Sequence, residues 1–175
     1  MAVPHSPQNA PSIAIVGGGI AGVTLTIALL KHCPHFRITL YESASAFGEI
    51  GAGVGFQPVM VRTMALIDPR VAAAFEKCIQ GNEETDPPIW FTIRVGDERK
   101  KGVAVGEEVF KIPSRSGPRG GVHRAHFLAE LVKLIPDGVA KFRKRVVDVV
   151  KAGDGSGAFL NCLAHGFPFA TNIGR

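Results

Sequence analysis

Apolar residues are concentrated in one uninterrupted stretch near the start of the chain, residues 13–30, which reads IAIVGGGIAGVTLTIALL. The short apolar run at 13–16 predicts a buried parallel strand, and residues 20 to about 32 favour a helix that is apolar over most of its surface. The stretch is uncharged and long enough to raise the question of a membrane span. Its glycines and its strand–turn–helix pattern favour a buried β-α unit instead.

The glycines between this strand and helix satisfy the pattern G-x-G-x-x-G as Gly17, Gly19 and Gly22. The first allows a sharp turn, the second lets the backbone approach a pyrophosphate, and the third lets the helix pack closely on the strand. The helix N-terminus then offers N–H groups and partial positive charge to phosphates. A second apolar segment ends at Glu42, twenty residues after Gly22, where a carboxylate suits a ribose diol. The pattern predicts a dinucleotide site, and the alternative is a packed β-α-β unit without a ligand.

A glycine-rich segment follows at residues 43–56, in which Gly51, Gly53 and Gly55 alternate with small apolar residues. We interpret it as a packed loop whose backbone lies against a ring system, the alternative being a flexible loop. Residues 58–67 read as a short helix that begins with proline. Asp68 is expected to cap a second helix, which begins with another proline and continues to residue 78.

Beyond residue 80 the pattern changes from helices to extended segments. Residues 89–95 and 103–112 read as strands, the second with a turn at Gly106, which favours an antiparallel crossover sheet over a third β-α unit. An amphipathic helix is expected at 123–135 and another strand at 139–150. Residues 158–175 show no clear period, so neither a helix nor a strand pair is expected there.

The composition of the chain narrows the classes of function that it could have. The chain has 175 residues, 46% of them apolar, which suggests one domain with a sizeable core. A net charge of +5 suits an anionic ligand, but the basic groups lack the interleaved aromatic residues typical of nucleic-acid binding, which is therefore not expected. Three scattered cysteines show neither disulfide nor metal spacing, so a reducing, cytoplasmic location is expected. His123 and His126 have no third ligand nearby in the sequence, and no metal site is expected.

Taken in order, these segments resemble the N-terminal part of the FAD-dependent aromatic-ring monooxygenases, most closely the fungal salicylate hydroxylase-like group. The resemblance covers residues 12–155 and rests on five matches: the glycine stretch, Tyr41-Glu42, FGEIGAGV at 47–54, LIDPRV at 66–71, and His123-Arg124 with the helix after it. It implies an α/β fold, a Rossmann-like FAD-binding β-α-β unit with a small antiparallel crossover sheet, truncated relative to the family. We expect a flexible leader at 1–11, an incomplete FAD-binding domain at 12–157 and a divergent tail at 158–175.

The resemblance implies FAD as cofactor, NADH or NADPH as co-substrate, and hydroxylation of a small aromatic compound. Gly17, Gly19, Ile20, Ala21 and Gly22 would hold the pyrophosphate, Glu42 the adenosine ribose, and the backbone of Val146 the adenine. Gly53 and Val54 would lie near the isoalloxazine ring, and Arg124 would contact the FAD chain and its phosphates. From the residues alone, Arg124 could equally be a solvated surface residue.

The sequence also departs from the family. Val59 follows Pro58 where the family commonly has asparagine, and the later "DG" and Gly-Asp motifs have no convincing counterpart. Glu49 and His123 are the only candidates for a catalytic acid or base near the flavin, and we interpret both as structural. Two alternatives therefore stay open: a non-catalytic FAD- or nucleotide-binding fragment, and an NAD-dependent dehydrogenase domain, which the glycine-rich loop and Arg124 disfavour.

Overall fold

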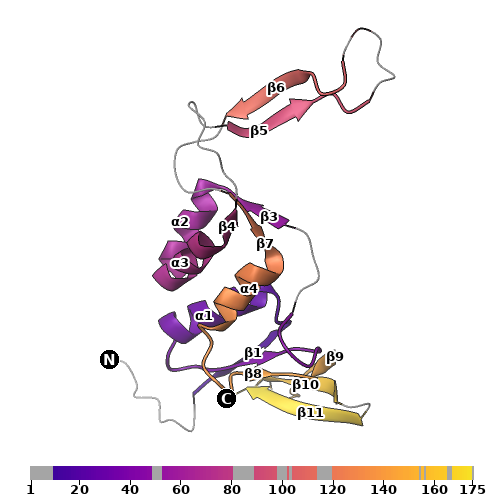
Figure 1. Ribbon diagram of the computed structural model, residues 1–175. Helices are drawn as coiled ribbons and strands as arrows, with labels where there is room; N and C mark the ends of the chain where they lie inside the picture. The colour runs from indigo at the N-terminus through magenta and orange to yellow at the C-terminus, as the bar shows by residue number, and fades with distance from the viewer. Residues whose placement is uncertain are drawn as a thin grey trace.

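The structure is a computed structural model that describes residues 10–48, 53–80, 89–97, 102, 104–113, 120–153, 155, 157–164 and 167–174. Its centre is a parallel β-α-β unit (Figure 1). β1 (Ser12–Val16) leads into α1 (Ile20–His32), and β2 (Arg37–Tyr41) returns in parallel beside β1. The short β8 (Ala140–Lys141) adds to the other side of β2, so the strand order is β1-β2-β8. The predicted strand–turn–helix–strand order is confirmed.

Three further helices build the core against α1. α2 (Pro58–Ile67) and α3 (Pro69–Cys78) are joined at Asp68, and α4 (Arg124–Val132) packs against α1 and α3. The largest fully buried side chains of this core are Phe75, Phe127, Ile27, Leu40, Leu128 and Leu131. α4 ends three residues before the predicted boundary, because the residues before Pro136 close in tight turns. No helix in the described part of the chain is long and apolar enough to cross a membrane.

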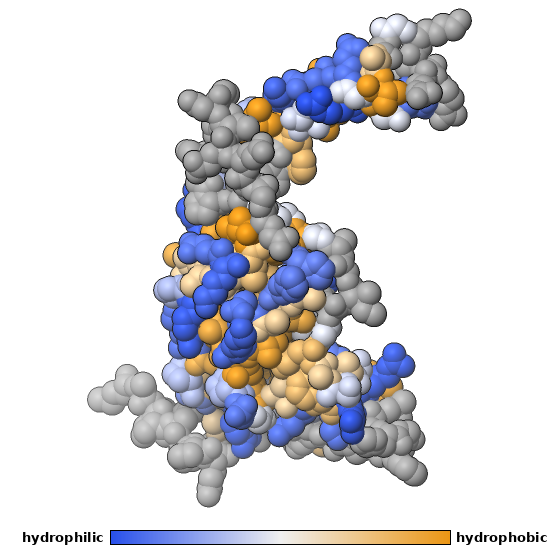
Figure 2. Space-filling model, viewed as in Figure 1, coloured by the Kyte–Doolittle hydropathy of each residue, from blue (hydrophilic) through white to orange (hydrophobic). Residues whose placement is uncertain are grey.

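Two small antiparallel sheets extend this core. The change of pattern after residue 80 predicted only the one formed by residues 89–94 and 108–113. The interpretation of residues 53–56 as part of a loop is wrong, because they pair with residues 120–123 as a strand. β3 (Gly53–Phe56) and β4 (Ile79–Gln80) flank β7 (Gly120–His123). β5 (Ile89–Arg94) and β6 (Glu108–Pro113) form a two-stranded ribbon that stands apart from the body (Figure 1). Apolar side chains lie exposed on this ribbon, as Figure 2 shows in orange, and they include Phe91 and Phe110.

The C-terminal part departs from the sequence-based expectation in two ways. The predicted single strand at 139–150 is divided into β8 and β9 (Arg145–Lys151), because Arg143 adopts a φ of 57° and turns the chain between them. The prediction of no strand pair in residues 158–175 is wrong. β10 (Gly157–Ala164) pairs antiparallel with β9 and with β11 (Phe167–Gly174), giving a sheet of order β11-β10-β9.

The reason for this strand pair lies in the burial of alternate residues of β10. Leu160 and Cys162 are almost fully buried and form a small second core with Tyr41 of β2. Phe159 directly precedes Leu160 and points to the other face of the strand, where it is 37% exposed. Apolar residues therefore occupy both faces of β10. The two-residue period is therefore hidden in the sequence, and the first half of the predicted tail packs onto the body of the fold.

Candidate functional site

The turn between β1 and α1 has a backbone geometry that only glycine fits at two positions. Gly17 has a φ of 101°, and its N–H donates a 2.8 Å hydrogen bond to the carbonyl oxygen of Tyr41. A Cβ on Gly22 would lie 2.0 Å from the carbonyl oxygen of Gly17. Gly22 thus lets the first turn of α1 lie directly on the glycine turn, as the motif predicts.

The N-terminus of α1 is free of side-chain caps. Gly19 occupies the cap position in an extended conformation, and its carbonyl accepts the first helical hydrogen bond from Val23 at 3.0 Å. Gly19 has no side chain with which to cap the helix, and no acidic residue stands in the first turn of α1. The N–H groups of Ile20 and Ala21 have no partner inside the helix by its geometry, so this end suits an anionic group.

Glu42 stands at the end of β2, directly beside the glycine turn. Its Oε2 accepts a 2.6 Å hydrogen bond from the N–H of Gly18, and its Oε1 accepts from the Ala44 N–H at 2.7 Å and from the Ser43 hydroxyl at 3.0 Å. Partial burial raises the pKa of Glu42, but the hydrogen bonds from Ala44, Gly18 and Ser43 outweigh burial and lower it. The carboxylate is therefore ionised near neutral pH and fixed in direction, and its remaining lone pairs can accept from a diol.

Gly18 is a site residue that the sequence motif did not single out. A Cβ there would lie 2.9 Å from Glu42 Oε2 and 2.9 Å from Phe47 Cε1. The absence of a side chain thus allows Glu42 and the ring of Phe47 to close over the turn. The motif G-x-G-x-x-G allows any residue at position 18. The only sign in the sequence that Gly18 matters is that it stands between two other glycines.

Backbone hydrogen bonds bring the start of β9 to Glu42. The Glu42 N–H donates to the carbonyl oxygen of Lys141 at 2.9 Å, and the Lys144 N–H donates to that of Glu42 at 2.8 Å. Val146 follows two residues later, half-buried against the small core around Tyr41. The structure therefore brings Val146 to the same end of β2 as Glu42, although more than a hundred residues separate them.

A second group of predicted site residues gathers around β3 and β7. Gly53 pairs with His123 and Val54 with Val122, and Arg124 follows at once as the exposed first residue of α4. Gly53, Val54 and Arg124 thus lie together where β3 and β7 lead into α4. Glu49 and Gly51 lie outside the described residues. His123 is exposed with its ring 4.6 Å from that of His126, and the described residues hold no group of three metal-ligating side chains.

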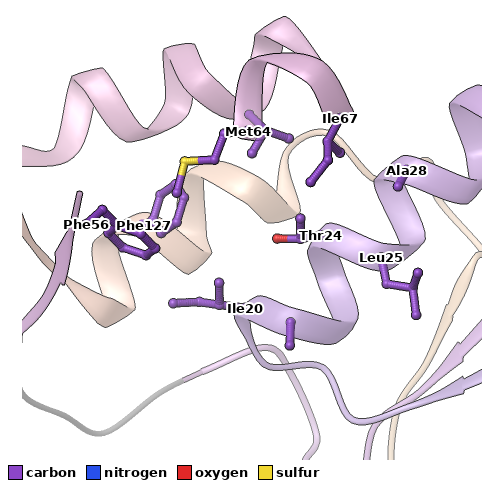
Figure 3. A pocket seen from close by; sticks show the side chains of 10 residues that line it. Ile20, Thr24, Leu25, Ala28, Phe56, Met64, Ile67 and Phe127 are labelled. Atoms are coloured by element: carbon purple, nitrogen blue, oxygen red, sulfur yellow. The ribbon is translucent and has the colours of Figure 1, made fainter. Parts of the chain in front are cut away.

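An apolar groove begins at the first residues of α1 (Figure 3). Its volume is about 390 Å³, and side chains of α1, α2, α3, β3 and α4 line it, among them Ile20, Phe56, Met64 and Phe127. None of the lining residues carries a charge, so the groove does not suit phosphates. The N-terminus of α1 beside it, which has no side-chain cap, suits an anionic group better.

Comparison with known proteins shows which proteins this chain is similar to. No protein-family model matches the chain. It is 40% identical over 154 residues to a 6-methylsalicylate 1-monooxygenase of Aspergillus terreus and 39% identical over 150 residues to a salicylate hydroxylase of Pseudomonas putida, with 86% of this chain covered in each case. The chain is homologous to part of the salicylate hydroxylase-like FAD-dependent monooxygenases. It covers 33% and 32% of these two relatives, about a third of their length.

Solved structures show the same relationship in three dimensions. A salicylate hydroxylase in complex with its substrate matches with a TM-score of 0.69 and 26% identity, over 93% of this chain and 34% of that one. The HpxO protein of Klebsiella pneumoniae, solved with FAD and uric acid, matches with a TM-score of 0.62 at 19% identity, which supports the fold. The α/β fold expected from the sequence is confirmed as that of the FAD-dependent monooxygenases.

Proposed function

We propose that this chain forms the FAD-binding part of an NAD(P)H-dependent monooxygenase that hydroxylates a small aromatic compound of the salicylate type. The observation that carries the proposal is the fixed carboxylate of Glu42 beside the glycine turn and the N-terminus of α1, which begins at Gly19 without a side-chain cap. A dinucleotide needs both features, backbone N–H groups at its phosphates and a carboxylate for its ribose. Two relatives named as FAD-dependent monooxygenases support FAD as that dinucleotide.

In this proposal, different residues bind different parts of the cofactor. Gly17, Gly19, Ile20, Ala21 and Gly22 hold the pyrophosphate at the end of α1, and Glu42 accepts from the ribose of the adenosine half. The backbone of Val146, at the same end of β2, lies at the adenine. Gly53 and Val54 hold the isoalloxazine end, and the guanidinium of Arg124 contacts the chain of the cofactor and its phosphates, where its charge is complementary.

When bound, FAD supplies the redox chemistry, accepting reducing equivalents from NADH or NADPH and activating oxygen for transfer to the ring. The chain's own contribution is to bind and orient the cofactor. We assign no catalytic acid or base among the described residues. The Glu42 carboxylate, ionised near pH 7, stays an acceptor and does not deliver a proton.

A second candidate is a non-catalytic FAD- or nucleotide-binding fragment. Two observations favour this second candidate. Apolar side chains lie exposed on the β5–β6 ribbon, and the chain covers only about a third of its relatives' length. We expect that this chain alone hydroxylates nothing, and NADH-dependent hydroxylation of salicylate by the purified chain would contradict that. The three free cysteines accord with the cytoplasmic location that we propose.

The test is a titration of the wild-type chain and two variants with FAD. Binding is monitored through the quenching of flavin fluorescence. Glu42→Gln keeps the shape of the side chain but removes its charge. Glu76→Gln makes the same change at an exposed position of α3 and serves as the control. We expect Glu42→Gln to weaken FAD binding about tenfold or more, the cost of one charge-assisted hydrogen bond, and Glu76→Gln to leave it unchanged. Equal affinities of all three proteins would contradict the assignment of Glu42.

A further inference from the structure

Two aromatic rings lie in contact at the end of the candidate site where Glu42 stands. Phe47, in the loop after β2, and Phe142, between β8 and β9, have ring centroids 4.8 Å apart and planes at 83°, an edge-to-face arrangement. Phe47 also reaches the glycine turn, since its Cε1 lies 2.9 Å from the place that a Cβ on Gly18 would take. The same place is 2.9 Å from Glu42 Oε2, so the aromatic pair begins directly at the turn and the carboxylate.

Backbone hydrogen bonds fix the two loops that carry these rings. The Arg143 N–H donates to the carbonyl oxygen of Ala44 at 2.8 Å, and the Lys144 N–H donates to that of Glu42 at 2.8 Å. Arg143 has a φ of 57°, a conformation that a residue with a side chain adopts only at a cost, so the chain turns sharply directly after Phe142. Rings that are fixed in this way lose little freedom when a ligand binds to them.

The hydrophobic core accounts for Phe47 but not for Phe142. Phe47 is half-buried and packs against the main core, whereas Phe142, also half-buried, belongs to neither hydrophobic cluster of the described residues. An aromatic ring among cations suits a ligand that is itself aromatic and carries negative charge. One ring serves a single base, whereas a nucleic-acid strand needs several. The sequence neighbours of Phe142 are all cationic: Lys141, Arg143, Lys144 and Arg145.

We propose that Phe142, held in place by Phe47, is the surface on which the adenine of the bound dinucleotide stacks. This inference rests on the proposed function, which takes the dinucleotide to be FAD. Val146, whose backbone we place at the adenine, follows Phe142 by four residues at the same end of β2. An edge-to-face pair leaves one ring with both faces clear of its partner, as stacking requires. Stacking of one base on an aromatic ring increases affinity about fivefold to a hundredfold.

Two substitutions at position 142 separate stacking from simple packing of the loops. Phe142→Leu keeps an apolar side chain against Phe47 but has no aromatic face, whereas Phe142→Tyr keeps the ring. Phe110→Ala removes a ring from the β5–β6 ribbon, which stands apart from the body (Figure 1), and is the control. Each protein is shown to be folded by circular dichroism and titrated with FAD. We expect Phe142→Leu to bind FAD about tenfold more weakly than the wild type and the other two variants to bind it equally well.

Each outcome of this titration decides between the two proposals. Equal affinity of the wild type and Phe142→Leu for FAD would overturn the stacking role and leave the proposed function intact. An equally large loss in Phe142→Leu and Phe142→Tyr would also overturn the stacking role, because the aromatic face would then make no difference. A folded wild-type chain that binds no FAD would overturn both proposals.

A second measurement detects the contact with adenine and uses no flavin. Phe142→Trp places an indole at the proposed surface, and the wild-type chain, whose one tryptophan is Trp90, gives the background emission. We expect excess ADP to quench the indole emission of Phe142→Trp and to leave that of the wild type unchanged, because a base stacked on the ring lies in direct contact with it. Emission of Phe142→Trp that does not change with ADP would overturn the proposal.

Discussion

The N–H of Gly18 donates a 2.6 Å hydrogen bond to Glu42 Oε2, across 24 residues of sequence. This bond fastens the turn after β1 to the end of β2, so the two parts of the candidate dinucleotide site form one rigid unit. The same carboxylate holds Ala44 and Ser43 through its other oxygen. The direction of the Glu42 side chain is therefore set before any ligand arrives, which lowers the entropic cost of binding one.

Substitution of Gly22 should be the most damaging single change in the glycine turn. The Cβ of Gly22→Ala would lie 2.0 Å from a backbone oxygen, and backbone cannot move aside cheaply. We expect a loss of about 3 kcal/mol or more in the free energy of unfolding, measured by urea denaturation. Gly121→Ala is the control, because a Cβ there meets nothing within 4 Å, and its loss should stay well under that. A Gly22→Ala protein as stable as the control would contradict the geometry of the turn.

Acid should weaken the fold through Asp68, the cap of α3. Hydrogen bonds from the exposed Arg70 side chain, working against burial, lower the pKa of Asp68 to about 2 from an ordinary value of 3.8. Because the folded-state pKa is the lower one, the stabilisation is complete above about pH 4 and disappears as the pH falls toward 2. Its size is about 1–2 kcal/mol, since Arg70 is open to solvent.

Urea denaturation at a series of pH values between 2 and 5 measures this contribution. Asp68→Asn keeps a side chain that can cap the helix but cannot titrate, so its stability should change less across this range. Asp137→Asn, at an exposed position, should behave as the wild type. The same pH dependence in Asp68→Asn and wild type would show that other carboxylates cause it.

The strand pair at the C-terminal end should contribute to stability through Leu160. This side chain is 2% exposed and packs against Tyr41, so Leu160→Ala should cost about 2–4 kcal/mol of unfolding free energy. Phe159→Ala, at the more exposed neighbouring position, should cost less despite its larger loss of volume. If Leu160→Ala were neutral, β10 would not pack on the body in solution.

The β5–β6 ribbon should make the chain prone to association. Phe91 pairs with Ile112 and Ile93 with Phe110, and all four side chains are at least 39% exposed. A two-stranded ribbon with an uncovered apolar face tends to associate. We expect the double substitution Phe91→Thr and Phe110→Thr to lower light scattering of the concentrated chain, whereas Val59→Thr with Met60→Thr, on exposed positions of α2, should lower it less. No difference between the two double variants would place the association elsewhere.

Much of the fold could be predicted because local signals agree with it. Pro58, Asp68 and Pro69 mark both ends of α2 and the start of α3, and the predicted ranges of the two helices match the structure. The break at Arg143 was missed because nothing in an arginine side chain signals a positive φ. β10 and β11 were missed because the buried face of β10 depends on Tyr41, far away in the sequence.

The candidate site was predictable where it follows a local motif and not where it depends on the fold. Gly17, Gly22 and Glu42 meet around one turn, as the spacing of G-x-G-x-x-G and the acidic residue indicated. The importance of Gly18 was hidden, because it comes from the side chains of Glu42 and Phe47 that close over it. The roles of Arg124, Val146, Gly53 and Val54 toward FAD stay predictions.

The most direct test of FAD binding by this chain is an absorption spectrum after reconstitution. The purified chain is incubated with FAD, passed through a desalting column, and shown to be folded by circular dichroism. We predict retained bands near about 370 and 450 nm, as expected of oxidised flavin, and their loss in Arg124→Ala. A folded chain that retains no flavin would contradict the account, because the turn, Glu42 and Arg124 would then not suffice to hold the cofactor.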